Sequence, residues 1–336
     1  MNAINRVAWA VPPGAKAGTR PARLVAELVK LNALVPDSRY FFHGRSASAG
    51  YSESVGVWRP FSKNVGDSGR SNLALLSPVF GARAVQDALW VDLYDDWSLA
   101  PDINLWHRTI ASKAYRSARS TGATVTANSV YMALKTGAPL SNVVPNGVDD
   151  SVAELVSSGD HRRRLIVLGH FFHGRTDFDV FRAMLTSQIF DEVVIGGAGM
   201  DKHMIAMLAE VSREHPGLLR VVEWLDEAAI ASLNGTRTIA LLPNVVSDYT
   251  LSQDMMKIYT FMALGIPVIC PRALWPSHLA PDFALLYDFG VKLDDVVAEW
   301  MDEERPSDVW RSEFARSNSW KERARKVIRI LGSESA

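Results

Sequence analysis

The sequence predicts an α/β protein of two domains, each built on a doubly wound parallel sheet. Strand-like and helix-like segments alternate along most of the chain, as is typical of parallel sheets covered by helices. The chain has 336 residues, 48% of them hydrophobic, and a chain of this length usually divides into two domains. Between 254 and 271 a short apolar helix leads through a Gly-x-Pro turn into a buried strand, which is the unit that such sheets repeat.

Residues 1–150 are predicted to form the first domain. Its strands are expected at 6–11, 40–43, 73–76, 88–94 and 123–126, and its helices at 21–34, 103–120 and from Ser129 onward. The turn signal Asn146-Gly147 and the polar stretch 149–164 mark the crossing into the second domain.

Residues 151–308 are predicted to form the second domain, which opens on a strand at 165–169. Further strands are expected at 192–196, 219–223 and 238–242, and helices at 201–214 and 227–233. A charged, amphipathic helix at 309–331 dominates the remaining segment, 309–336.

The helix–turn–strand unit at 254–271 is the most informative part of the second domain. Gly265 can adopt the left-handed conformation that ends a helix, and Pro267 prevents the helix from continuing. The helix N-terminus, with its free N–H groups and positive dipole end, is a place where a phosphate can bind. Lys257 lies in that first turn.

Composition argues against several classes of protein. The net charge is −1, whereas nucleic-acid-binding domains usually display a marked basic excess. Cys270 is the single cysteine, which excludes an internal disulfide and fits a reducing compartment. No charged and then apolar leader opens the sequence, and no apolar run approaches the ~20 residues that span a bilayer. We therefore expect a cytoplasmic protein without dedicated nucleic-acid binding.

Three short motifs occur in order along the chain. They are Asp92-x-x-Asp95-Asp96-Trp97, then Val144-Pro145-Asn146-Gly147-Val148-Asp149, then Lys257-Ile258-Tyr259 with Met262-Ala263-x-Gly265-x-Pro267-Val268-Ile269. The third resembles the donor-binding segment of GT-B glycosyltransferases, especially bacterial relatives of glycosyltransferase family 4. The first resembles the D-x-x-D-D-W of teichuronic-acid and xanthan-type transferases, and the second resembles the V-P-N-G-V-D at the junction of the two domains.

This resemblance implies a GT-B fold, in which two Rossmann-like domains face a central cleft. The first domain would bind the acceptor, the second would bind a nucleoside-diphosphate sugar, and a C-terminal helix would pack back toward the first domain. The implied activity is that of a hexosyltransferase, which transfers a sugar from a nucleoside-diphosphate donor to an acceptor hydroxyl. A UDP-sugar is the favoured donor.

The resemblance also implies a set of donor-binding residues in the second half. Lys257 and Arg175 would supply cations for the diphosphate, Gly197 a close backbone approach, and Trp224 with Leu225 a place for the nucleobase. The full set is Lys257, Met256, Gln253, Asp254, Arg175, Gly197, Trp224, Leu225 and Tyr259. The plainer interpretations are a solvated Lys257, an Arg175–Asp177 ion pair, a tight turn at Gly197 and a core tryptophan at Trp224.

The sequence departs from the family at two positions. Many retaining relatives carry two glutamates on this segment, at the positions that Ser252 and Thr260 occupy here. The contacts to the sugar hydroxyls and the ribose are then missing, or come from groups such as Gln253 or Asp254.

The chemistry requires a carboxylate or imidazole that takes or orients the acceptor proton. Asp95 and Asp96 lie at the end of a predicted strand, where adjacent side chains point to opposite faces, so one faces the substrate while the other caps the next helix. We favour Asp96 for the chemistry and expect Asp92 to be structural. His107 is a further candidate base, and Pro13, Gly14 and Gly18 belong to the expected acceptor-side loop.

The predicted helix 103–120 is basic as well as amphipathic. Arg108, Lys113, Arg116 and Arg119 are interleaved with Trp106, Ile110 and Tyr115. One interpretation is peripheral contact with an anionic membrane and a lipid-linked acceptor. The other is a solvated helix that covers its own sheet, which leaves a soluble glycan, a protein, a small molecule or modified DNA as the acceptor.

No cofactor beyond the nucleotide sugar is expected, and no essential metal. Asp177-Phe178-Asp179 has the spacing of a metal motif, but it opens a predicted helix, where a capping role is expected. Two alternative functions stay open. One is a nucleotide-sugar epimerase, which shares the fold, and the other is a catalytically silent sugar-nucleotide-binding subunit, which Ser252 and Thr260 favour.

Overall fold

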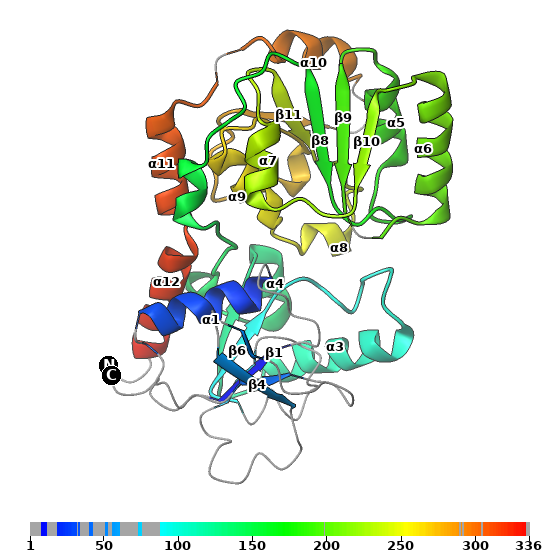
Figure 1. Cartoon of the computed structure of the whole chain (residues 1–336). Helices are drawn as coiled ribbons and strands as arrows, with labels where there is room; N and C mark the ends of the chain where they lie inside the picture. Colours follow the sequence, from blue (N-terminus) through cyan, green and yellow to red (C-terminus); the bar gives the residue numbers. More distant parts are fainter. Residues whose placement is uncertain are drawn as a thin grey trace. The chain divides into compact units, whose positions relative to one another are not determined.

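The computed structural model describes residues 8–11, 19–31, 33, 40–42, 51–52, 56–60, 73–75, 88–197, 199–288, 290, 292–303 and 305–333. The chain divides into two compact units (Figure 1). Unit 1 comprises Met1–Gly147, Ser252–Asp254 and Ser319–Ala336, and unit 2 comprises Val148–Leu251 and Met255–Asn318. Ser252–Asp254 thus belong to unit 1, although the expected bounds 151–308 assign them to the second domain.

Unit 1 contains a seven-stranded sheet in the order β3-β4-β2-β1-β5-β6-β7. The strands are β1 (Ala8–Val11), β2 (Tyr40–Phe42), β3 (Tyr51–Ser52), β4 (Gly56–Pro60), β5 (Leu73–Leu75), β6 (Trp90–Leu93) and β7 (Thr124–Ala127). All neighbouring pairs are parallel except β3 with β4. The strand predicted at 88–94 is present as β6, which is shorter at both ends.

The described helices of unit 1 include two that come from opposite ends of the sequence. They are α1 (Arg20–Lys30) and α12 (Trp320–Ser333), and the others are α3 (Leu105–Ala118), α4 (Val130–Thr136) and the 3₁₀ turn Leu140–Asn142. Leu24 and Leu28 of α1 share one buried apolar cluster with Val327 of α12. As the resemblance implies, the C-terminal helix packs on the first domain.

The single helix expected at 309–331 is two helices, α11 (Asp308–Ser317) in unit 2 and α12 in unit 1. Asn318 is the C-cap of α11, and the hydroxyl of Ser319 accepts a hydrogen bond of 3.3 Å from the backbone N–H of Glu322. Ser319 therefore caps a second helix. The amphipathic pattern of the sequence runs through this break without interruption, so the pattern alone predicts one helix.

Unit 2 contains a six-stranded parallel sheet in the order β10-β9-β8-β11-β12-β13. The strands are β8 (Arg164–Leu168), β9 (Glu192–Gly196), β10 (Leu219–Val222), β11 (Thr238–Leu241), β12 (Val268–Pro271) and β13 (Ala284–Tyr287). The helices are α5 (Phe178–Thr186), α6 (Lys202–Glu214), α7 (Glu227–Leu233), α8 (Asp248–Leu251), α9 (Met256–Ala263), α10 (Asp294–Trp300) and α11, with 3₁₀ turns Asp150–Glu154 and Arg272–Leu274.

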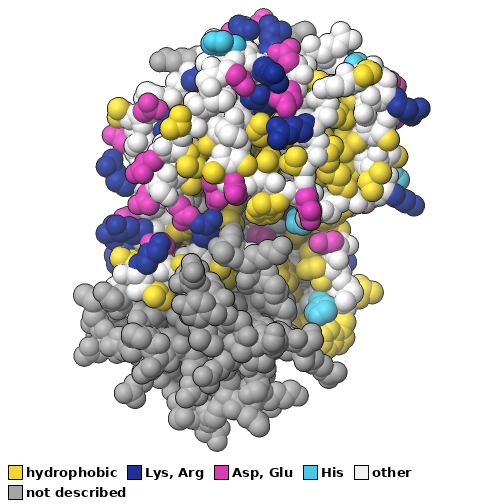
Figure 2. Space-filling model, in the orientation of Figure 1, with side chains coloured by type: hydrophobic (Ala, Val, Ile, Leu, Met, Phe, Trp, Pro, Cys, Tyr) yellow, Lys and Arg dark blue, Asp and Glu magenta, His cyan; other side chains and the backbone are white. Residues whose placement is uncertain are grey.

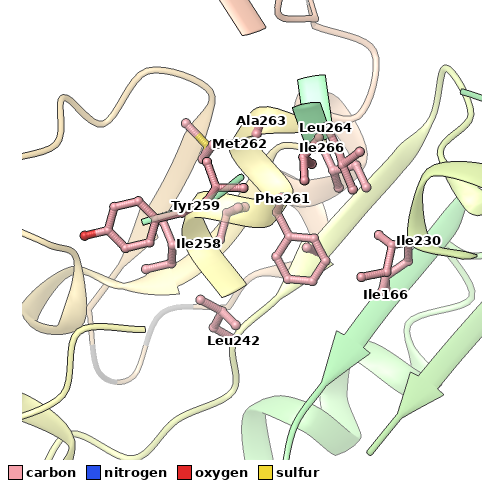
Figure 3. Close-up of a cluster of buried hydrophobic side chains, with 14 of the residues drawn as sticks. Ile166, Ile230, Leu242, Ile258, Tyr259, Phe261, Met262, Ala263, Leu264 and Ile266 are labelled. Atoms are coloured by element: carbon pink, nitrogen blue, oxygen red, sulfur yellow. The ribbon is translucent and has the colours of Figure 1, made fainter. Parts of the chain in front are cut away.

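Two apolar cores cover the two faces of this sheet, because alternate strand residues point to opposite sides. Ile166 of β8 packs with α7, α9 and α11, and Figure 3 shows Phe261 reaching from α9 toward Leu242 and Ile166. The neighbouring Leu165 and Val167 pack with α5, α6 and α10. Helices therefore cover both faces, which leaves the carboxyl ends of the strands for binding loops.

Candidate functional site

Lys257 occupies the predicted first turn, that of α9 in unit 2. Its side chain extends to the carboxyl end of β8, where its Nζ donates a hydrogen bond to the carbonyl oxygen of Leu168. The N-cap residue, Met255, supplies no side-chain hydrogen bond to the first-turn N–H groups. Both the amine and these N–H groups are therefore suited to an anion at this edge of the sheet.

A second cation, Arg175, lies close enough to act on Lys257. Burial of the amine and the positive charge of Arg175 together lower the pKa of Lys257 to about 7. In the described part of the chain Arg175 makes no ion pair with Asp177, which instead caps α5 by accepting a hydrogen bond of 3.1 Å from Val180 N–H. The Arg175–Asp177 pair is thus a wrong interpretation, and two neighbouring like charges remain that an anion would stabilise.

The loops after the paired strands β8 and β9 approach each other so closely that only glycine fits at Gly197. A Cβ there would lie 1.7 Å from the carbonyl oxygen of Gly169. The N–H of Gly169 in turn donates to the carbonyl oxygen of Gly196 at 2.9 Å, and a Cβ on Gly169 would lie 2.9 Å from Lys257 Nζ. Gly197 therefore permits a close approach of two backbones beside the lysine, which a simple tight turn would not require.

Trp224 and Leu225 follow β10 at the same edge of the sheet. The side chain of Trp224 is 72% exposed, so the interpretation of a core tryptophan is wrong. Leu225 is half-buried, and its Cδ1 would lie 3.2 Å from a Cβ on Gly196. Tyr259 is fully buried instead, with a hydrogen bond of 2.9 Å between its hydroxyl and Nε2 of His278, so its position suits packing.

Asp95 and Asp96 follow β6 in unit 1, but they do not continue the strand. Asp95 has φ 54°, the left-handed region that Asp and Asn tolerate better than most residues. Strand alternation therefore does not separate the two side chains, and this step of the sequence-based prediction is wrong.

The contacts of Asp96 are those of a buried structural carboxylate. Its Oδ1 accepts hydrogen bonds from the backbone N–H of Ser98 at 3.1 Å and from the hydroxyl of Ser98 at 2.6 Å. Its Oδ2 forms an ion pair with Lys135, and the carboxylate side chain is fully buried while Lys135 is 27% exposed. Asp96, favoured above for the chemistry, is thus engaged within the protein.

Asp95 is half-buried, and two amides hold it from different parts of the sequence. Nδ2 of Asn128 donates to its Oδ1 at 3.1 Å, and Nε2 of Gln253 donates to its Oδ2 at 3.3 Å. The amide oxygens Asn128 Oδ1 and Gln253 Oε1 are buried without a hydrogen-bond partner among the described residues. Because buried polar atoms are normally paired, these two oxygens mark a place for a hydrogen-bond donor.

The segment Ser252–Asp254 binds unit 1 rather than the loops around Lys257. The hydroxyl of Ser252 accepts a hydrogen bond of 2.7 Å from the backbone N–H of Asp96. Asp254 is buried and accepts a hydrogen bond of 2.5 Å from the backbone N–H of Asn146. Gln253 and Asp254, expected at the donor site, thus position Asp95 and the motif at 144–149.

Asp92 is buried in an ion pair with Arg20 at 2.9 Å, as expected for a structural residue. His107 is exposed on α3, and its described hydrogen bonds are with Asn104, the N-cap of that helix. Pro13, Gly14 and Gly18 lie outside the described residues.

Helix α3 exposes only part of its expected basic face. Arg108 is half-buried and donates to the carbonyl oxygen of Ser98 at 2.9 Å. Lys113, Arg116 and Arg119 are exposed, and Arg119 donates to the carbonyl oxygen of Lys135 at 2.8 Å. The first residues of the helix are exposed and apolar, with Leu105 77% and Trp106 67% exposed.

Two absences apply to the described residues alone. No group of three or more His, Cys, Asp or Glu side chains among them is arranged to hold a metal ion. None of the helices within these ranges is long and apolar enough to cross a membrane.

The fold places the chain in a defined structural class. The chain has the GT-B fold of glycosyltransferases, with two parallel-sheet units and a C-terminal helix that returns to the first unit. No protein-family model matches the sequence, and no curated protein matches it either. The class therefore rests on structural similarity.

Solved structures of this class match the chain over nearly its whole length. AviGT4, a glycosyltransferase involved in avilamycin A biosynthesis, matches with a TM-score of 0.56 and 11% identity over 97% of each chain. The lipopolysaccharide outer core galactosyltransferase WaaB matches with a TM-score of 0.63 and 12% identity over 98% of this chain and 99% of that one. HepE from Anabaena, in complex with UDP and glucose, matches with a TM-score of 0.68 and 11% identity over 98% of this chain and 100% of that one.

Sequence reasoning missed three residues of these arrangements. Gly169 and Asn128 each follow a strand directly. Binding loops of parallel sheets begin at this position, so it could have indicated both residues. Ser252 was noted only for the glutamate that it replaces, and its bond to unit 1 had no signal in the sequence.

Proposed function

We propose that the chain is a glycosyltransferase that moves a hexosyl unit from a nucleoside-diphosphate sugar, with a UDP-sugar favoured, to an acceptor hydroxyl. The observation that carries this proposal is the half-buried Lys257 beside Arg175, at the carboxyl edge of the unit 2 sheet. Two cations without a described carboxylate partner suit a diphosphate. HepE, which has the same fold, binds UDP and UDP-glucose.

The two cations have a chemical role in this reaction. The bond from the anomeric carbon to the diphosphate oxygen breaks, its electron pair leaves with the nucleoside diphosphate, and the acceptor oxygen bonds to the anomeric carbon. Negative charge on the leaving group grows during this step, so fixed cations stabilise the transition state more than the ground state. Trp224 and Leu225 are the proposed contacts of the nucleobase, and Met256 borders the diphosphate.

Asp95 is the proposed group for the acceptor proton in unit 1. It is half-buried, whereas Asp96 is fully buried and paired with Lys135. The two amides that hold the Asp95 carboxylate leave their own oxygens as acceptors for the hydroxyl groups of a substrate. This assignment reverses the roles expected from the sequence, and His107 becomes a remote second candidate.

The proposed reaction needs no metal, because Lys257 and Arg175 supply the positive charge that a cation would bring to the diphosphate. Chelation provides the test. Turnover that is unchanged in excess EDTA supports the proposal, and turnover that EDTA abolishes and Mg²⁺ restores contradicts it.

Helix α3 is the proposed contact with an anionic membrane, which would make the acceptor lipid-linked. The exposed Leu105 and Trp106 would enter the headgroup region beside the exposed cations Lys113 and Arg116. Elsewhere, Figure 2 shows basic and acidic side chains interspersed over the described face of unit 2. Co-sedimentation with vesicles that contain phosphatidylserine, lost at high salt and in Trp106→Ser, is the expected result, and no binding at low salt contradicts the contact.

Incubation with labelled nucleotide sugars tests the function. Release of nucleoside diphosphate that depends on an acceptor supports transfer, and conversion of the sugar without release indicates an epimerase instead. Binding without either reaction indicates a silent subunit, which the replacement of both family glutamates by Ser252 and Thr260 favours.

A further inference from the structure

A cavity of about 560 Å³ lies in unit 2 at the edge of the sheet opposite Lys257. Pro267 immediately precedes β12 and Ala284 is the first residue of β13, so the cavity is at the amino ends of these parallel strands. Figure 1 shows α10, which ends beside the cavity, at the edge from which β8 and β9 run away. The volume is within the range of ligand sites, about 300–1,000 Å³.

Three half-buried aromatic side chains line this cavity. The rings of Phe283 and Trp310 meet edge to face, with centroids 5.1 Å apart and an interplanar angle of 79°. Trp310 also stacks on Phe314 at 5.1 Å, which fixes its plane, and Trp300 at the end of α10 is the third aromatic. Phe283 has φ 55°, an uncommon backbone conformation for a non-glycine residue, and one that occurs preferentially at functional sites.

Polar groups of both kinds surround these rings. Asp282 and Glu303 are exposed carboxylates, which accept hydrogen bonds. The guanidinium of Arg305 is held by the carbonyl oxygens of Thr236, Thr238 and Met301 at 3.0, 3.2 and 3.1 Å, and its remaining N–H groups stay available as donors. The indole N–H groups of Trp300 and Trp310 have no acceptor in the part of the chain that the structure describes.

We infer that this cavity binds a neutral hexose unit of a glycan. A sugar ring has an apolar C–H face that packs on an aromatic ring, and hydroxyl groups that both donate to carboxylates and accept from guanidinium and indole N–H groups. A phosphorylated ligand would meet the charges of Asp282 and Glu303, and an organic cation would meet that of Arg305. A hydroxyl-rich neutral ring satisfies both sets of groups.

The inference goes beyond the proposed transfer reaction. The cavity and Lys257 belong to opposite edges of one parallel sheet, so the sugar here is bound and not chemically changed. The two sites can therefore be tested separately.

Saturation-transfer difference NMR with maltose, cellobiose and lactose tests the inference on the whole chain. At least one of these disaccharides is expected to bind the wild-type protein. Trp300→Ala and Glu303→Gln are each expected to weaken that binding at least tenfold. Trp224→Ala, which removes an exposed indole at the other edge, and Lys257→Met are the matched controls and should leave it unchanged.

Because Glu303 is exposed, Glu303→Gln keeps the test valid if Trp300→Ala fails to fold. The inference is overturned if none of the three disaccharides binds the wild type, or if both cavity variants bind as the wild type does. Saturable binding of tetramethylammonium without sugar binding also overturns it, in favour of a cation site. Loss of sugar binding in Lys257→Met would place the sugar at the donor edge. Absence of UDP binding by the wild type would contradict the proposed transfer reaction and would leave the sugar site in this cavity unaffected.

Discussion

At the scale of single residues, the environments of two charged groups, Lys257 and Asp95, determine their proposed roles. Lys257 combines a conspicuous motif position with burial and a neighbouring cation, and together these distinguish it from the solvated lysines of most helices. Asp95 is distinguished from Asp96 by its contacts alone, since both belong to the same motif. Sequence identifies such groups, and structure assigns their roles.

Binding of UDP should weaken as pH rises from 7 to 9. The pKa of Lys257 is about 7 in the free protein, and a bound diphosphate raises it, so binding takes up a proton above pH 7. The fall in affinity should steepen toward about tenfold per pH unit as the free lysine loses its proton. Calorimetry in buffers of different ionisation enthalpy measures the proton uptake, which should vanish in Lys257→Met. Uptake that persists in this variant would assign the proton to another group.

The same shifted pKa affects folding in the opposite direction. Between pH 7 and about 10.4 the unfolded chain binds more protons at this lysine than the folded protein does, so the free energy of unfolding rises with pH across this window.

Asp95→Asn and Asp96→Asn should have opposite effects. Asparagine tolerates the left-handed backbone of Asp95, so Asp95→Asn should keep its melting temperature while turnover falls about 100-fold. Asp96→Asn disrupts a largely buried ion pair and should destabilise the protein by about 2 kcal/mol, less than a fully buried pair because Lys135 is partly exposed.

Thermal unfolding and the rate of UDP release with the acceptor found by the labelled-donor assay check both variants. UDP binding, measured alongside, should be unchanged in both. A collapse of turnover in Asp96→Asn at full stability, with a normal rate in Asp95→Asn, would restore the roles expected from the sequence.

At the scale of elements, the close approach of the loops after β8 and β9 lies at the candidate donor site. The two loops approach backbone to backbone beside Lys257, and a side chain at Gly197 has no room to move aside. A substitution at Gly197 therefore tests the shape of these loops and not the charge of the site.

Gly197→Ala should weaken UDP binding at least tenfold and lower the melting temperature, because its Cβ would lie 1.7 Å from the Gly169 carbonyl oxygen and must push the loops apart. Gly122→Ala is the matched control, since a Cβ at Gly122 meets nothing within 4 Å. Calorimetry with UDP and thermal unfolding of both variants give the result. Equal UDP affinity in the Gly197→Ala variant and the wild type would show that the close approach of these loops does not shape the binding site.

At the scale of the whole molecule, the sequence predicted the fold well because its signals are local and repeated. The alternation of strands and helices and the Gly265-x-Pro267 helix end are present in the described structure. Asn146-Gly147 forms no turn there, but it lies where unit 1 passes into unit 2. The break between α11 and α12 was missed because a single serine cap interrupts a continuous amphipathic pattern.

The site was less predictable, since it depends on contacts between distant segments. The sequence named Lys257, Arg175 and Gly197 as candidates. It could not show that Gln253 contacts Asp95, or that Asp96 pairs with Lys135, 39 positions along the chain. Such pairs arise from tertiary packing. A motif shared by two adjacent aspartates carries no information on which one is buried.

Calorimetric titration of UDP into the wild type, Lys257→Ala and Lys202→Ala tests whether the start of α9 binds the nucleotide diphosphate. Lys202 is exposed and begins α6, so Lys202→Ala controls for the loss of a helix-start lysine. Lys257→Ala should lose a charge-assisted contact worth about 1.5–3 kcal/mol, which weakens binding about 10- to 150-fold, while Lys202→Ala binds as the wild type does. Equal UDP affinity in all three proteins, or no UDP binding by the wild type, would contradict a nucleotide-diphosphate site at the start of α9.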